Sequence, residues 1–413
     1  MSELPPGWAW STLGELGEYL NGRGFKKSEW RESGRPIIRI QNLTGSGTEF
    51  NYFDGEPEER YIARDGDLLV SWAATLGVYV WRGSEAVVNQ HIFKVVSRID
   101  RGFHRYLLQA TLDDLHRQTH GSGMVHITRG KFDSTPVAIP PLNEQRRIVA
   151  AIEEHLSRLD AAEASLDTAG RRTCLSRESA LEVAFTNGGP KAAIGAIASL
   201  TDGPFGSNLK TAHYVADGPR VVRLQNIGDG VFRDERAHIT HEHYSALPKH
   251  AVMPGDVVVA SLGEEAPRAC LIPDWLGDAI VKADCIRLRA NAEVDASYVM
   301  WALNSRPVKL QAASRIKGIG RPRLGLRGIR DLHIPVPPLE EQRRIVAEVE
   351  RRLSAIDALR AAIERARRRS AALRRAVLER AFRGELVPQD PSDEPAEALL
   401  ARIRAGRDIS PAR

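Results

Sequence analysis

The sequence has little cysteine and no long hydrophobic run. Its 413 residues include only three cysteines, Cys174, Cys270 and Cys285, which are far apart, odd in number and without the spacing of metal ligands. This pattern argues against a disulfide framework and a zinc site, and it predicts reduced thiols in a cytoplasmic protein. No apolar run approaches the ~18 residues that cross a bilayer. Residues 1–8 lack the basic and apolar regions of a secretory signal.

Motifs for nuclease and methyltransferase chemistry are also missing. There is no Asn-Pro-Pro-aromatic or Asp-Pro-Pro-aromatic segment to hold a flipped adenine, and no Gly-x-x-x-x-Gly-Lys-Ser/Thr phosphate loop. No lysine follows an acidic residue at the Asp/Glu-x-Lys spacing of many nuclease metal sites. One stretch is rich in histidine, with His238, His241, His243 and His250. Histidine is a common metal ligand, but we prefer to interpret the stretch as a polar loop. The sequence thus predicts a chain without catalytic residues, metal or cofactor of its own.

The bulk composition is that of an ordinary globular protein. Hydrophobic residues make up 42% and charged residues 27%, and the length suggests two or more domains. The net charge of +5 favours a polyanionic partner, but only weakly. Arginine outnumbers lysine, which suits bidentate contacts to guanine edges and phosphates, although a GC-rich genome explains the same bias equally well.

What the sequence does contain is an internal repeat. Residues 139–150 return as residues 336–347, 197 positions later, and only two of the twelve positions differ. The match continues to Phe185 and Phe382. Further upstream it is fainter and its offset drifts, as in residues 34–43 against 218–227. A drifting offset predicts loops of different length on a shared scaffold, so we infer one structural unit present twice.

The back of each copy predicts a long helix. A Pro-Pro pair ends the preceding segment, Asn143 is a plausible N-cap in the first copy, and apolar residues then recur at three- and four-residue spacing. Each helix is expected to run about 40 residues, or ~60 Å at 1.5 Å per residue. The near-heptad seams predict that the two helices pair as a coiled coil with a partly polar interface. The antiparallel direction follows from the chain path, because the first copy leads into a second globular unit before the second helix begins. Two separate amphipathic helices are the alternative.

The front of each copy predicts a mixed, mostly β domain. Apolar runs punctuated by Gly, Asp and Pro indicate strands: residues 36–43, 66–72, 78–81, 86–96, 220–227, 256–261 and 279–288. Short helices are expected at 103–116 and 296–312. The predicted fold class is therefore α+β, with two mixed α/β domains separated by two long helices that form an antiparallel coiled coil, related by a pseudo-twofold repeat. The predicted boundaries are 1–139 and 189–336 for the domains, 140–188 and 337–390 for the helices, and 391–413 for a tail with a possible helix at 396–404.

A globular front followed by Pro-Pro-Leu-x-Glu-Gln-x-x-Ile and a long helix, all present twice, resembles the DNA-specificity subunit of type I restriction-modification systems. The resemblance covers essentially the whole chain. Three shorter segments fit the same family: residues 4–8, 202–207 and 382–387.

The resemblance implies that each front is a target-recognition domain for one half of a split double-stranded DNA sequence. It implies that the helix pair is a spacer, and that two modification subunits dock on the chain and methylate adenine with S-adenosylmethionine. Restriction subunits, where present, would use ATP with Mg²⁺. The specificity subunit itself has no active site in this family, and no membrane is involved.

Base reading needs forked donors and amides on loops that a scaffold holds in place. We therefore predict DNA contacts from polar side chains in loops and at strand ends of both fronts. In the first front they are Arg23, Lys26, Lys27, Arg39, Gln41, Asn42, Trp72, His126 and Arg129. In the second front they are Ser207, Asn208, Lys210, Arg223, Gln225, Asn226, Lys317, Arg321 and Arg323.

Several of these predictions have an alternative. Arg39, Gln41 and Asn42 recur at 223, 225 and 226 although the two fronts should read different bases, which favours a structural or phosphate-contacting role. The acidic-amide pair at each helix start predicts either a partner-docking surface or a helix start: Glu144, Gln145, Glu341 and Gln342. For the whole chain, the runner-up is a single-chain methyltransferase or nuclease with duplicated recognition domains. An anti-restriction decoy or inactive remnant is less favoured because both fronts look intact.

Overall fold

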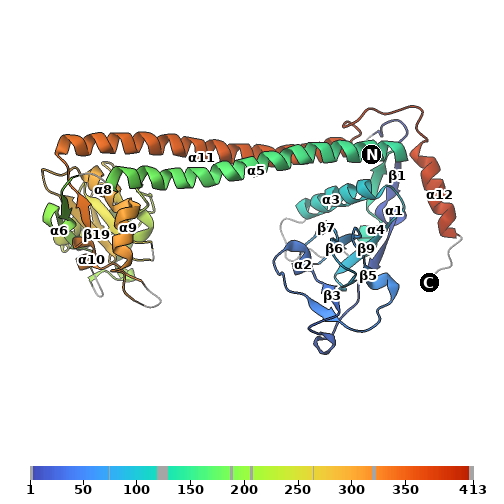
Figure 1. Ribbon diagram of the computed structural model, residues 1–413, viewed down its shortest axis with the longest axis horizontal. Helices are drawn as coiled ribbons and strands as arrows, with labels where there is room; N and C mark the ends of the chain where they lie inside the picture. Colours follow the sequence, from blue (N-terminus) through green and yellow to red (C-terminus); the bar gives the residue numbers. More distant parts are fainter. Residues whose placement is uncertain are drawn as a thin grey trace. The chain divides into compact units, whose positions relative to one another are not determined.

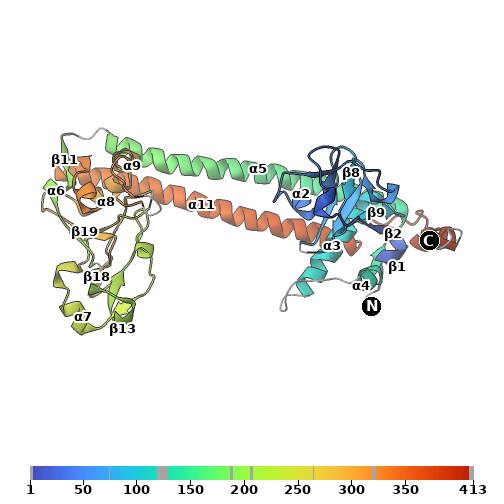
Figure 2. The ribbon, with the colours of Figure 1, turned by 90° about the horizontal axis from the view of Figure 1, so that it is seen from below.

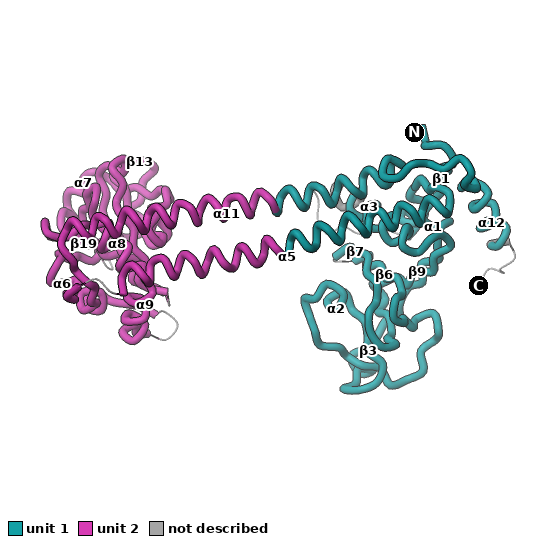
Figure 3. The backbone as a smooth tube through the Cα atoms, turned by 45° about the horizontal axis from the view of Figure 1, so that its top comes forward, with its two compact units in different colours: residues 1–164, 367–413 teal, residues 165–366 magenta. Residues whose placement is uncertain are grey.

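The computed structural model has two compact units. Unit 1 comprises residues 1–164 and 367–413, and unit 2 comprises residues 165–366 (Figure 3). The described residues are 3–73, 75–118, 129–186, 189–204, 208–263, 265–318 and 322–408. Among them, no helix is both long and apolar enough to cross a membrane.

Unit 1 contains two four-stranded sheets and a two-stranded ribbon (Figure 1). The ribbon pairs β1 (Ala9–Thr12) with β10 (Pro136–Ile139). One sheet is antiparallel, in the order β2 (Gly17–Asn21), β9 (Ile92–Ser97), β6 (Leu68–Ser71), β7 (Gly77–Val80). The other has the order β4 (Asn51–Phe53), β3 (Arg35–Ile38), β8 (Ala86–Val88), β5 (Ile62–Ala63), with β3 and β8 parallel. The helices are α1 (Leu13–Leu16), α2 (Ile40–Thr44), α3 (Arg101–Gln118) and α4 (Arg129–Asp133), with 3-10 turns η1 (Lys27–Glu29) and η2 (Glu59–Tyr61).

Unit 2 repeats this architecture sheet for sheet. Its ribbon pairs β11 (Lys191–Ala193) with β20 (His333–Pro335). Its sheets have the orders β12 (Ala198–Asp202), β19 (Cys285–Ala290), β16 (Val257–Ala260), β17 (Arg268–Leu271) and β14 (His238–Ile239), β13 (Tyr214–Val222), β18 (Ala279–Val281), β15 (Ala251–Val252). The helices are α6 (Ile194–Ile197), α7 (His241–Ser245), α8 (Ala296–Asn304), α9 (Arg306–Ala313) and α10 (Leu326–Arg330), with η4 (Thr211–His213), η5 (Leu224–Asn226) and η6 (Pro248–His250). The duplication predicted from a faint sequence match is therefore confirmed for the fronts as well as the helices.

The recurring Gly-Asp pair explains part of this faint match. Gly66 and Gly255 turn the chain before a central strand with φ of +87° and +82°, a conformation that glycine adopts without steric cost. The Asp67 carboxylate then accepts a hydrogen bond from the backbone N–H of Arg64 at 2.9 Å. Asp256 makes the equivalent bond in the second copy. The pair is therefore part of the scaffold in both units.

Some predicted elements were wrong in type or continuity. Residues 86–96 and 279–288 were each expected to form one strand, but each forms two strands around a polar turn. The strands that end at Ile38 and Val222 are each followed by a helical turn. In each turn an asparagine side chain accepts a hydrogen bond from the backbone N–H of the arginine three residues earlier. The helix expected at 296–312 breaks at Ser305, because Pro307 lies in the first turn of a new helix.

Two long helices, α5 (Leu142–Thr186) and α11 (Leu339–Phe382), lie side by side in each unit (Figures 1 and 2). In unit 1, Arg374 of α11 contacts Asp160 and Glu163 of α5, and Glu163 also accepts a hydrogen bond from Ser370 at 3.0 Å. In unit 2, the Arg177 guanidinium lies 3.7 Å from Asp357. Later residues of α5 pair with earlier residues of α11, so the predicted antiparallel coiled coil with a polar seam is confirmed.

The C-terminal segment belongs to unit 1. The expected tail helix is present as α12 (Ala396–Asp408), and the N–H of Ala396 donates to the carbonyl of Gly7 at 2.9 Å. Leu400 of α12 and Phe103 of α3 belong to the same buried core. The first globular domain is thus completed by residues from the far end of the chain, whereas the sequence had suggested a separate tail.

Candidate nucleic-acid interface

Three segments of unit 1 meet at one end of its sheets. The loop after β2 contacts the turn between β8 and β9, because the N–H of Arg23 donates to Val88 (2.8 Å) and the N–H of Gln90 donates to the carbonyl of Arg23 (2.9 Å). Trp72, directly after β6, donates its N–H to the carbonyl of His91 at 3.4 Å. Two residues predicted to contact DNA, Arg23 and Trp72, are therefore brought to one edge.

Arg23 is held between two aromatic rings. Its guanidinium carbon lies 4.8 Å from the ring of Phe25 and 4.7 Å from that of Phe53, and it forms an ion pair with Glu29. The backbone N–H of Lys26, followed by the charge of Arg23, holds the pKa of Glu29 below its usual value. The neighbouring predicted residues Lys26 and Lys27 are exposed. The loop thus presents a preorganised arginine beside two exposed lysines, a suitable combination for phosphate contacts.

The polar turn at residues 89–91 was missed by the sequence analysis. Gln90 and His91 are exposed, and the ring of Trp72 stacks on Phe93 with centroids 5.7 Å apart while its edge meets His91 at 5.6 Å. Trp72 therefore packs partly inward, and the exposed polar groups at this edge come from the turn. The signal was the run Asn-Gln-His inside an otherwise apolar segment, which marks an interruption of the strand.

Unit 2 has the same junction with different side chains. Gly203 after β12 approaches the turn at residues 282–284, and its N–H donates to the carbonyl of Cys285 at 3.1 Å. A Cβ atom added to Gly203 would lie 2.1 Å from the backbone of Lys282, and one added to Gly22 would lie 2.3 Å from the carbonyl oxygen of Asn89. Glycine is therefore required at the same position of both units. The two turns differ completely in their side chains, which are Asn89, Gln90 and His91 in unit 1 and Lys282, Ala283 and Asp284 in unit 2.

Among the predicted residues of unit 2, Arg323 contacts this junction directly. Arg323 forms an ion pair with Asp284 of the turn, and its backbone exchanges two hydrogen bonds with Lys317, at 2.8 and 3.0 Å. Asn208 and Lys210 are exposed in the loop after β12. Lys282, which was not predicted, lies 5.3 Å from the ring centroid of Tyr214. Two cationic side chains, Lys282 and Arg323, thus lie at the turn, and the loop after β12 adds exposed amide and ammonium groups.

The repeated Arg-x-Gln-Asn segment is largely structural. Asn42 accepts a hydrogen bond from the N–H of Arg39 at 3.0 Å, and its amide donates to the carbonyl of Glu49 at 2.9 Å. Asn226 accepts from the N–H of Arg223 at 2.8 Å and donates to two carbonyls of the following loop. This geometry favours the structural alternative for both asparagines. The glutamines of the two segments, Gln41 and Gln225, are exposed and remain predicted DNA contacts.

The glutamines at the helix starts join each domain to its helix. Gln145 accepts a hydrogen bond from the N–H of Asp100 at 3.0 Å and donates to the carbonyl of Pro140 at 2.9 Å. Gln342 accepts from the N–H of Asp295 at 2.9 Å and donates to Pro337 at 2.8 Å. Both side chains are fully buried. The burial argues against the docking surface for these two residues, which instead join each domain to the start of its helix.

Glu144 and Glu341 differ although they occupy equivalent positions. Glu144 is buried, accepts hydrogen bonds from the indole of Trp8 (3.1 Å) and from Gln389 (3.3 Å), and has a pKa raised by burial. Glu341 is partly exposed and pairs with Arg344, whose side chain donates to it and lowers its pKa. Glu144 therefore has a framework role, while Glu341 keeps an accessible carboxylate.

The comparisons with known proteins agree with this organisation. Residues 5–167 match the family described as the type I restriction modification DNA specificity domain. The specificity subunit of the type I restriction enzyme EcoBI from Escherichia coli is 24% identical over 443 residues, covering 98% of this chain and 93% of that subunit. Over these lengths the chain is similar to the type I restriction specificity subunits. The MjaVIII specificity subunit of Methanocaldococcus jannaschii is 20% identical, covering 86% and 87% of the two chains.

Solved structures of specificity subunits have the same fold. The HsdS subunit of Thermoanaerobacter tengcongensis aligns over 93% of this chain and 98% of its own with a TM-score of 0.58 at 20% identity. A chain from a study of complex assembly and conformational transition of the type I R-M system aligns over 93% and 100% with a TM-score of 0.76, also at 20% identity. With relatives of this kind, the single-chain methyltransferase or nuclease is not favoured.

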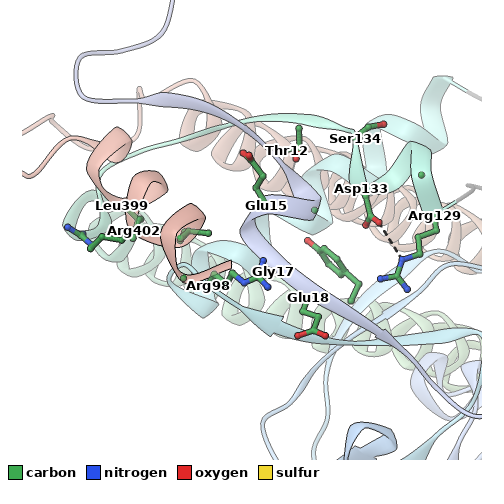
Figure 4. Close-up of a pocket in the computed structure, with 15 residues that line it drawn as sticks. Thr12, Glu15, Gly17, Glu18, Arg98, Arg129, Asp133, Ser134, Leu399 and Arg402 are labelled. Atoms are coloured by element: carbon green, nitrogen blue, oxygen red, sulfur yellow. Dashed lines mark hydrogen bonds and ion pairs between the residues drawn. The ribbon is translucent and has the colours of Figure 1, made fainter. Parts of the chain in front are cut away.

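Other predicted positions contribute less to this candidate interface. His126, Ser207 and Arg321 lie outside the described residues. Arg129 begins α4, 3.4 Å from Asp133, and helps to line a cavity of about 1170 Å³ beside α12 (Figure 4). Because α12 has no repeat in unit 2, this cavity is unlike the duplicated strand-end junctions.

The histidine-rich stretch hydrogen-bonds to backbone carbonyls. His238 contacts Gly218 at 2.7 Å, His243 contacts Asn208 at 2.8 Å, and His250 contacts Asp202 at 2.7 Å. Within the part of the chain that the structure describes, no three His, Cys, Asp or Glu side chains are grouped to hold a metal ion. These histidines therefore order the loops of unit 2.

Removing the buried glutamine of either unit is expected to destabilise the protein. Gln342→Ala leaves the Asp295 N–H and the Pro337 carbonyl without this partner, and each buried unsatisfied group costs about 1–3 kcal/mol. Gln145→Ala should have a similar effect in unit 1. Urea denaturation of each variant measures the loss. Gln41→Ala, at an exposed site, is the control, and a change below about 0.5 kcal/mol in both buried variants would contradict the framework role.

Proposed function

We propose that this chain reads a bipartite DNA target for a type I restriction-modification complex, with each globular domain reading one half. The observation that carries the proposal is the duplicated junction: two identical sheet arrangements end in loops whose exposed side chains differ. A common scaffold with different loops is the arrangement expected for two readers of different sequence. The target then has two unlike halves and need not be palindromic.

The helix pair supports a spacer role. Helices α5 and α11 have 45 and 44 residues, which corresponds to about 65 Å each at 1.5 Å per residue. One turn of DNA spans ~34–36 Å, so a helix pair of this length is sufficient to hold two readers on successive turns of one duplex face. We propose that the preferred gap between the half-sites follows from this length.

The proposal assigns the chemistry to other subunits. In this arrangement two modification subunits bind the duplicated frame and methylate adenine with S-adenosylmethionine, and restriction subunits add ATP- and Mg²⁺-dependent cleavage. The chain itself positions these subunits on DNA. The repeated scaffold supports this division, because a pseudo-twofold frame matches two identical partners.

The purified chain is expected to bind duplex DNA with strong salt dependence. A protein that contacts six or more phosphates loses on the order of 10³-fold in affinity between 50 and 200 mM salt. Replacing both Lys26 and Lys27 with glutamine should reduce the slope of log Kd against log salt by about two, since each lysine contributes about one. Fluorescence anisotropy with a labelled duplex measures the slope.

The matched control is Arg402→Gln on α12, an exposed arginine outside the junction. Its slope should equal that of the unmodified chain. Affinity that is insensitive to salt, or a slope that the double lysine variant leaves unchanged, would contradict DNA contact by this loop.

A further inference from the structure

The repeat leaves one surface covered in unit 1 and open in unit 2. In unit 1, the connection between α11 and α12, residues 383–395, crosses the start of α5, and we call it the strap. Asp393 of the strap accepts hydrogen bonds from Arg147 at 2.7 Å and from Asn143 at 3.2 Å. Its carboxylate is only 5% exposed. Leu386 and Val387 of the strap pack against the core of unit 1.

The equivalent surface of unit 2 is a groove. Ile148 and Ala381 are fully buried in unit 1, whereas Ile345 and Ala184, 197 positions away in each case, are partly exposed. They contribute to a cavity of about 440 Å³ between α5 and α11. Its floor and walls include Ala180, Val183, Ala184, Ile345, Val349 and Arg344. The copies share the alanine, isoleucine and arginine of this surface, at 184/381, 345/148 and 344/147, whereas Val183 corresponds to Arg380. The strap lies on the unit 1 copy.

The open groove has an apolar floor, and its charged lining residues are Arg344 and the ion pair of Arg352 with Glu348. Val183 is 64% exposed, an unusual condition for an aliphatic residue beside other apolar side chains. Arg344, the counterpart of Arg147, has a side chain that is 77% exposed and pairs with Glu341 three residues earlier. Exposed pairs of this kind contribute little, so the guanidinium is available to a better-placed carboxylate.

We propose that the groove of unit 2 binds an extended segment of a different polypeptide, chemically similar to the strap. An apolar pair of the segment lies over Ala184 and Ile345, and a carboxylate a few residues later pairs with Arg344. The occupied copy supplies the template, because in unit 1 Asp393 pairs with Arg147, and Leu386 and Val387 pack against the core that contains Ile148 and Ala381.

The segment comes from a different polypeptide because the strap of this chain is not free. Asp393 is buried against Arg147, and α12, which follows the strap, contributes Leu400 to the core of unit 1. The strap of a second copy is held in the same way. The inference concerns assembly and does not depend on the proposed DNA-reading role.

A synthetic peptide with the sequence of residues 383–395 is the probe. A fluorescently labelled peptide is titrated onto the full-length chain, and binding is measured by anisotropy. We expect saturable binding that Arg344→Glu weakens at least tenfold, because the charge pair becomes a repulsion. Ala184→Trp, which fills the groove, should also weaken binding at least tenfold. A peptide with Asp393→Asn should lose affinity to a similar extent.

Arg351→Glu is the matched control, since Arg351 is exposed on the same helix but does not line the groove. It should bind the peptide like the unmodified chain, and melting curves of all variants should coincide. Photo-cross-linking should place the peptide on residues 341–349. Absence of binding, binding that Arg344→Glu leaves unchanged, or cross-links to residues 143–148, where the peptide would have displaced the chain's own strap, would each overturn the proposal.

Discussion

Gly203→Ala is expected to abolish recognition of one half of the DNA target and leave the other half readable. The added Cβ would lie 2.1 Å from the backbone of Lys282, far inside van der Waals contact. Neither group can move without separating the loop after β12, which carries the exposed Asn208 and Lys210, from the turn at 282–284, which carries Lys282. Each good base contact contributes about 1–3 kcal/mol, so losing two or three lowers discrimination by on the order of 10²-fold or more.

Gly22→Ala is the mirror experiment in unit 1, where the Cβ would lie 2.3 Å from the carbonyl oxygen of Asn89. Selection of binding sites from a random duplex library measures the information retained in each half-site. We expect each variant to lose sequence preference in one half-site, and the two variants to lose it in different half-sites. Gly325→Ala, where a Cβ meets open space, is the control. Loss of both halves in a single variant would contradict independent readers.

Removing one heptad from each long helix is expected to shorten the preferred gap between the half-sites without changing the bases read. In an antiparallel pair, facing residues have numbers with a constant sum. The pairs of Asp160 with Arg374 and of Arg177 with Asp357 share one such sum and therefore define a single register. Deleting residues 165–171 together with 363–369 therefore preserves the antiparallel register. Seven residues correspond to about 10 Å of helix, or roughly three base pairs at 3.4 Å each.

The gap is measured by selecting targets from a library in which the spacer between the half-sites varies in length. Deletion of 165–171 alone is the control, because it puts the two seams out of register and should disrupt the pair rather than reset the gap. An unchanged optimal gap in the double deletion would show that the helices do not set the spacing.

The parts of the fold that the sequence predicted are those that depend on residues close together in the chain or on the repeat. The helix starts follow a Pro-Pro pair, and the Gly-Asp turns need a positive φ at Gly66 and Gly255, so both copies keep the same residues there. The pairing of the helices followed from two similar apolar seams in one chain, and its antiparallel direction followed from the chain path through the second globular unit. These features depend on neighbours within a few residues or on exact repetition.

The parts that were missed depend on contacts between distant residues. Asn143 was expected to cap its helix, but the helix begins at Leu142 and the Asn143 amide donates to Asp393, 250 residues later. The burial of Gln145 depends on Asp100 and Pro140 converging on it, which no spacing in the sequence reveals. The turn at 89–91 was predicted as part of a single strand, because apolar residues flank it on both sides. Its exposure follows from the pairing of β8 and β9 with different sheets.

The most direct test of the central claim is a methylation map of DNA modified by the complex reconstituted from this chain and its modification subunits. Sequencing that detects methylated adenine defines the target whatever its bases are. Two readers joined by a helix pair predict a target of two short specific halves separated by a gap of fixed length and arbitrary sequence. A single contiguous specific site, with every position defined, would contradict the account.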